Sequence, residues 1–153
     1  MARMASYFQP MKIFTIGYEG TTQAEFVAAL QAAGVERVID VRAVPLSRKP
    51  GFSKNIVRNG LAEAGIDYVL LKALGTPPAG REAARKGRHA ELERIYAEQL
   101  DLAEAIVAAA EMRELAAEKP SALLCYERDP AGCHRTLLLR AVAGDAEVVD
   151  LFP

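Results

Sequence analysis

The sequence has little cysteine and no excess of charge of either sign. Its 153 residues include two cysteines, and 19 lysines and arginines are balanced by 20 aspartates and glutamates. Two cysteines exclude a disulfide-rich secreted fold, and a net charge of -1 gives no overall attraction to nucleic acid or a membrane surface. No apolar run approaches the roughly 20 residues of a membrane-spanning helix. The first residues lack a hydrophobic stretch followed by a cleavage site, so we expect no signal peptide. We therefore expect a cytoplasmic protein that does not bind membranes.

The composition is typical of one globular domain. Hydrophobic residues make up 51% of the chain and charged residues 25%. We expect residues 1–11 to form a flexible N-terminal extension and residues 12–153 to form a single domain. The chain has neither a Walker phosphate loop nor a dinucleotide fingerprint, so we expect no cofactor.

Five short apolar segments predict β-strands, and the segments between them have helical spacing. The predicted strands cover residues 13–16, 37–41, 66–71, 121–126 and 147–152. The predicted helices cover residues 22–33, 54–64, 88–119 (as one helix or as two with a break near 99–101) and 129–143, while the glycine- and proline-rich segment 74–87 is expected to be a loop. This alternation predicts an α/β fold: a mostly parallel five-stranded sheet with helices on both faces, in a Rossmann-like three-layer arrangement.

Most polar candidates follow the carboxyl ends of the predicted strands, where parallel sheets bind ligands. Because they should meet at one edge, we expect a pocket for a phosphate- or carboxylate-bearing ligand, in a hydrolase or transferase. The expected ligand-binding residues are Gly17, Tyr18, Glu19, Asp40, Arg42, Ser47, Arg48 and Arg135. The expected catalytic residues are Cys133, His134 and Glu127.

Two readings of Cys133 are open. In the first turn of a helix beside His134 and Arg135, its thiolate would be favoured, with His134 as a base and Arg135 binding an oxyanion. Alternatively, Cys133 packs in the core as a small apolar residue. Cys125, inside an apolar strand, is expected to be inert packing, and a disulfide between the two cysteines is not expected in a reducing cytoplasm. The two cysteines and His134 lack the paired spacing of zinc motifs, so no metal is expected.

The segment from Arg42 to Arg88 is basic, with ten lysines and arginines but three acids. Arg42 either pairs with Asp40 or Glu127 or points at an anionic ligand. The alternative function is a non-catalytic nucleic-acid or protein-interaction module using residues 42–88, in which loop 47–53 contacts phosphates and an exposed Phe52 stacks on bases. A third reading pairs the basic region with the acidic region 91–119 in a homo-oligomer.

Four motifs together resemble the DUF488 family over residues 12–152. They are Thr15-Ile-Gly-Tyr-Glu-Gly20, the segment from Val38 to Lys54, Leu123-Leu-Cys-Tyr-Glu127 and Cys133-His-Arg135. The resemblance implies an α/β fold with no agreed activity. It carries the family's motif residues onto Gly17, Asp40, Arg42, Pro45, Ser47, Cys125, Glu127, Cys133, His134 and Arg135. The chain departs from the family pattern at Tyr18-Glu19 and at Leu74-Gly75-Thr76, which indicates a subgroup.

Overall fold

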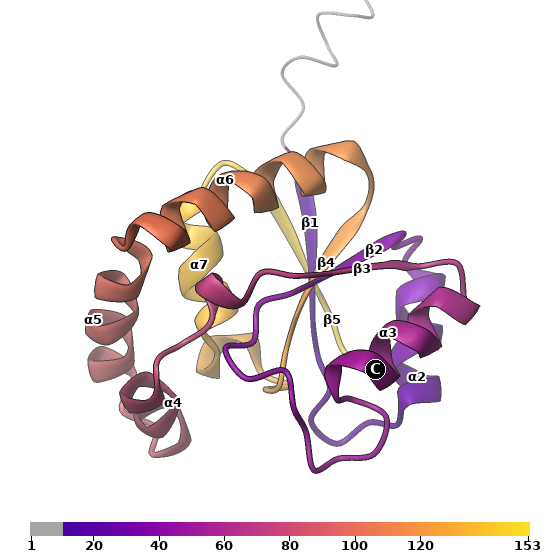
Figure 1. The fold of residues 1–153 in the computed structure, drawn as a ribbon, viewed down its shortest axis with the longest axis horizontal. Helices are drawn as coiled ribbons and strands as arrows, with labels where there is room; N and C mark the ends of the chain where they lie inside the picture. The colour runs from indigo at the N-terminus through magenta and orange to yellow at the C-terminus, as the bar shows by residue number, and fades with distance from the viewer. Residues whose placement is uncertain (1–10) are drawn as a thin grey trace, which may run out of the picture.

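A computed structural model describes residues 11–153 and shows one five-stranded sheet (Figure 1). The strands are β1 (Lys12–Gly17), β2 (Arg37–Asp40), β3 (Asp67–Leu70), β4 (Ser121–Cys125) and β5 (Glu147–Leu151). All neighbouring strands pair in parallel, in the order β3-β2-β4-β1-β5. The predicted α/β class is therefore confirmed. The predicted flexible extension 1–11 lies, except for Met11, outside the described residues.

Helices cover both faces of the sheet (Figure 1). One face packs against α2 (Gln23–Ala32) and α3 (Lys54–Glu63) through a core that includes Phe26 and Leu61. The other packs against α5 (His89–Leu100), α6 (Ala103–Glu118) and α7 (His134–Val142) through a core that includes Tyr96 and Met112. Among the described residues, no helix combines the length and apolarity needed to cross a membrane.

A local sequence signal explains the start of α2, and the long predicted helical segment forms two helices. Thr22 forms the predicted capping box with Glu25, because the threonine hydroxyl accepts from the Glu25 amide and the glutamate carboxylate accepts from the Thr22 amide. The long segment 88–119 forms two helices, α5 and α6, which are separated at residues 101–102.

Two predicted segments differ from the structure. Residues 74–87 are not a loop, because α4 (Pro78–Arg85) forms there after a short 3-10 helix, η1 (Lys72–Leu74). Proline is compatible with the first turn of a helix, where its missing N–H is not needed. The helix predicted over 129–143 is interrupted: residues 130–132 form the 3-10 helix η2, and the extended backbone of Cys133 separates it from α7.

The end of β1 touches the chain that follows β4. A Cβ atom at Gly17 would overlap the carbonyl oxygen of Glu127, so this close approach requires glycine. Gly17 therefore sets the position of the backbone that carries Glu127.

We expect Gly17→Ala to lower the free energy of unfolding by about 1–3 kcal/mol or more, because the added methyl group must displace the Glu127 backbone. Gly132→Ala is the matched control, since a Cβ there meets no atom within 4 Å and its φ is not positive. Urea unfolding of both variants should show a change within about 0.5 kcal/mol for the control. Equal stability of the two variants would contradict the close packing at Gly17.

Candidate functional site

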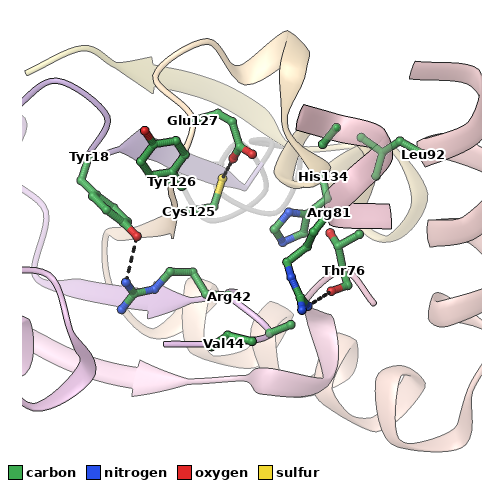
Figure 2. Close-up of a pocket in the computed structure, with 12 residues that line it drawn as sticks. Tyr18, Arg42, Val44, Thr76, Arg81, Leu92, Cys125, Tyr126, Glu127 and His134 are labelled. Atoms are coloured by element: carbon green, nitrogen blue, oxygen red, sulfur yellow. Dashed lines mark hydrogen bonds between the residues drawn. The ribbon is translucent and has the colours of Figure 1, made fainter. Parts of the chain in front are cut away.

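A cavity of about 120 Å³ lies at the carboxyl-end edge of the sheet (Figure 2). Its walls come from the segments after β1, β2 and β4, from the start of α7 and from α4 and α5. The wall residues that can bind or react with a ligand include Tyr18, Arg42, Arg81, Cys125, Tyr126, Glu127 and His134.

A buried ion pair forms one side of this cavity. The Asp40 carboxylate is fully buried and accepts from Arg42 Nε at 2.9 Å and from Arg42 Nη2 at 2.8 Å, as well as from the hydroxyl of Tyr68. Burial alone would lower the pKa of Arg42, but the hydrogen bonds and charge of Asp40 outweigh it and raise that pKa above its ordinary value. Of the alternatives for Arg42, the structure therefore shows the pair with Asp40.

The remaining guanidinium nitrogen of Arg42 holds neighbouring segments. Arg42 Nη1 donates to the carbonyl oxygen of Phe52 at 2.7 Å and to the Tyr18 hydroxyl at 3.3 Å. The Phe52 ring is 0% exposed and stacks on Tyr18 with ring centroids 4.5 Å apart. The expectation of an exposed Phe52 that stacks on bases is therefore wrong, because an aromatic ring in a polar loop is covered here by tertiary contacts.

Six of the eight predicted ligand-binding residues do not line the cavity. Gly17, Asp40 and Arg135 are buried in the packed interior, and Glu19, Ser47 and Arg48 lie in loops. The Ser47 amide donates to the Ser53 hydroxyl at 3.0 Å, which closes the basic loop on itself, and Arg48 in that loop is exposed. Glu19 is exposed, and its carboxylate accepts from the Arg128 amide at 3.1 Å. Glu19, Ser47 and Arg48 therefore belong to loops outside the cavity.

The two cysteines lie together at the end of β4. The structure joins Cys125 and Cys133 in a disulfide, which contradicts the expectation that they do not pair. Because the chain reverses through η2, residue 133 returns beside the strand it left. Cys125 is not merely packed in the strand: it lines the cavity, with its sulfur 3.3 Å from Glu127 Oε2. Cys133 is the N-cap of α7 rather than part of its first turn, and it is 2% exposed.

Arg135 is fully buried behind the cavity wall. Its Nη1 lies 3.1 Å from the sulfur of Cys125, and its guanidinium donates to the carbonyl oxygens of Glu127 and Arg128. Within residues 11–153, no carboxylate forms an ion pair with Arg135, and its Nε has no hydrogen-bond partner. Arg135 would reach a ligand only by giving up these contacts.

His134 is buried, and a single backbone contact sets its tautomer. Its Nε2 lies 2.8 Å from the carbonyl oxygen of Val41, which can only accept, so Nε2 carries the proton. Its Nδ1 therefore presents a lone pair, 3.7 Å from the sulfur of Cys133. Burial lowers the pKa of His134 to about 4, so the imidazole is neutral at pH 7.

The cavity's remaining charged side chains lie on different walls. Burial raises the pKa of Glu127 above its ordinary value. Arg81, from α4, is half-buried, and its Nη1 donates to the carbonyl oxygen of Thr76 at 2.8 Å. Sequence reasoning missed Arg81 as a site residue because segment 74–87 was expected to be a loop; the tandem prolines at 77–78 were the available signal of a helix start.

We expect Asp40→Asn to lower the free energy of unfolding by about 3–5 kcal/mol, because it leaves the buried Arg42 guanidinium without its charge partner. Glu98→Gln is the control, since it removes an exposed ion pair with Arg94 worth about 0.3–0.5 kcal/mol. Chemical denaturation would measure both. A loss for Asp40→Asn as small as that of the control would contradict a stabilising role for the buried pair.

The chain matches a protein-family model. The family model described as "Domain of unknown function DUF488" matches residues 22–142, which is most of the chain. No curated protein and no solved structure matches the chain.

Proposed function

The chain belongs to the DUF488 family, and from the geometry of its cavity we propose that it is an enzyme acting on a small anionic ligand. The ligand bears a phosphate or carboxylate group, and the reaction is a hydrolysis or a group transfer. The observation that carries this proposal is the position of Arg81, a cation on the cavity wall with which no described residue forms an ion pair. Its hydrogen bond to Thr76 orients the guanidinium while leaving other N–H groups for an anion.

The size of the cavity supports a small ligand. Pockets for drug-sized molecules enclose roughly 300–1,000 Å³, whereas this cavity has about 120 Å³. Inorganic phosphate or a short carboxylate matches that space better than a nucleotide does.

The predicted catalytic residues take different places in this proposal. Glu127 lies on the wall of the cavity and is the residue we assign as general acid or base, because its carboxylate is accessible to a bound ligand. His134 lines the same cavity. Cys133 does not line it, but it is joined by the disulfide to Cys125, which does. The alternative nucleic-acid function loses support, because Phe52 is buried and Arg42 is paired with Asp40.

We expect inorganic phosphate to raise the thermal stability of the protein at constant ionic strength. A ligand at 100 times its dissociation constant adds about 2.7 kcal/mol to the free energy of unfolding. Arg81→Ala should weaken phosphate binding roughly 10- to 150-fold, the equivalent of the 1.5–3 kcal/mol of a charged hydrogen bond.

Arg85→Ala provides the matched control for this experiment. Arg85 is an exposed arginine in the last turn of the same helix, so its loss removes the same charge without touching the cavity. Phosphate and small carboxylates should stabilise this variant as they stabilise the unmodified protein. Equal weakening in both variants would show binding by overall charge alone and would contradict the proposed pocket.

A further inference from the structure

Three side chains of the kinds that bind metals converge at the end of β4. The sulfurs of Cys125 and Cys133 and a ring nitrogen of His134 all lie within 4.8 Å of one another. Cys125 and His134 also line the cavity (Figure 2). Two thiolates and a neutral imidazole suit Zn²⁺. We propose that the reduced protein binds Zn²⁺ through Cys125, Cys133 and His134, with the fourth coordination position open to the cavity.

The spacing between Cys133 and His134 already fits this ion. Zinc binds sulfur at about 2.3 Å and nitrogen at about 2.0–2.1 Å, so tetrahedral geometry puts the two ligand atoms about 3.6 Å apart. The sulfur of Cys133 lies 3.7 Å from His134 Nδ1. These two ligands therefore need little rearrangement to bind a shared ion.

The backbone spacing of the two cysteines also favours an ion between them. Their Cα atoms are 7.6 Å apart, whereas disulfides usually join Cα atoms at about 4.4–6.8 Å. Two thiolates bound to one zinc ion lie about 3.8 Å apart, which needs more room than a covalent bond between the sulfurs. Once the disulfide is reduced, the backbone provides that room.

His134 is held ready to coordinate. The carbonyl oxygen of Val41 binds its Nε2–H at 2.8 Å, which fixes the ring and leaves the Nδ1 lone pair toward Cys133. Histidines that bind metals almost always donate their other ring N–H to a carbonyl or carboxylate in this way.

Both sulfurs also receive hydrogen bonds from Arg135. Its Nη1 lies 3.1 Å from the sulfur of Cys125, and its backbone amide lies 3.5 Å from that of Cys133. N–H donors of this kind stabilise negatively charged sulfur. Two thiolates balance the charge of Zn²⁺, so the three ligands and the ion would form an electrically neutral group.

The open position faces the proposed reaction site. Zinc sites with three protein ligands leave a fourth position for water or substrate, unlike the closed four-ligand sites that only hold a fold together. Glu127 Oε2 lies 3.3 Å from the sulfur of Cys125, on the cavity wall. Its carboxylate could therefore exchange a proton with a water or substrate molecule in the open position. The zinc site uses different atoms from the Arg81 anion site, so either can fail without the other.

The test uses the full chain, purified with a reductant. Titration with Co²⁺ should produce the thiolate-to-cobalt charge-transfer band and the visible bands of tetrahedral cobalt. In a separate sample loaded with Zn²⁺, elemental analysis should find about one zinc per chain. Loss of a residue that only hydrogen-bonds a metal ligand weakens metal binding about 10- to 100-fold. Cys125→Ser, Cys133→Ser and His134→Gln each remove a ligand itself, so each should weaken zinc binding at least about 100-fold. His89→Gln is the matched control, because His89 is exposed at the start of α5 and should leave binding unchanged.

Circular dichroism checks that each variant is folded, and a thiol assay checks that both cysteines are reduced. Metal binding that is lost in the three ligand variants and kept in His89→Gln would support the site. A folded, reduced protein that binds neither Co²⁺ nor Zn²⁺ would overturn the proposal. So would binding that survives all three ligand substitutions, or a disulfide that persists in reductant.

Discussion

The buried ion pair between Asp40 and Arg42 determines how one side of the cavity is built. A buried charge is tolerated only when partners satisfy it, and here those partners come from separate segments. Tyr68 of β3 bonds to the Asp40 carboxylate, while Tyr18 after β1 and the Phe52 carbonyl bond to the Arg42 guanidinium. The pair therefore joins strands β2 and β3 to the loops that surround the cavity, and Phe52 stacks on Tyr18, whose ring also contacts the Arg42 guanidinium.

The opposite side depends on contacts to the chain that follows β4. The missing side chain of Gly17 admits the Glu127 backbone, and Arg135 holds the Glu127 and Arg128 carbonyls from the interior. These contacts fix where the Glu127 side chain and the sulfur of Cys125 face the cavity. Arg135 thus holds the backbone in place, whereas Arg81, on the wall formed by α4, is the cation that we propose binds the ligand.

The sequence carried enough information for the sheet and for the edge where polar residues gather. Alternating strands and helices predict a parallel sheet, and the carboxyl-end rule then places Tyr18, Arg42, Glu127 and His134 near one another, as the cavity lining shows. Contacts between residues far apart in the sequence could not be predicted in the same way. Phe52 sits among polar and basic neighbours in the sequence, yet its burial depends on Tyr18, 34 positions away. The contact between Cys125 and Cys133 depends on the reversal at η2, which neither zinc spacing nor strand periodicity indicates.

We propose that polar groups from several strand ends form one ligand site. An NMR titration of the ¹⁵N-labelled protein with phosphate tests it most directly, because each backbone amide reports its own surroundings. We expect the amides of Thr76, Arg81, Glu127 and His134, which belong to different elements but line one cavity, to shift together with a common dissociation constant. Shifts confined to the exposed basic loop around Arg48, or no shifts at saturating phosphate, would show that these groups do not form one ligand site.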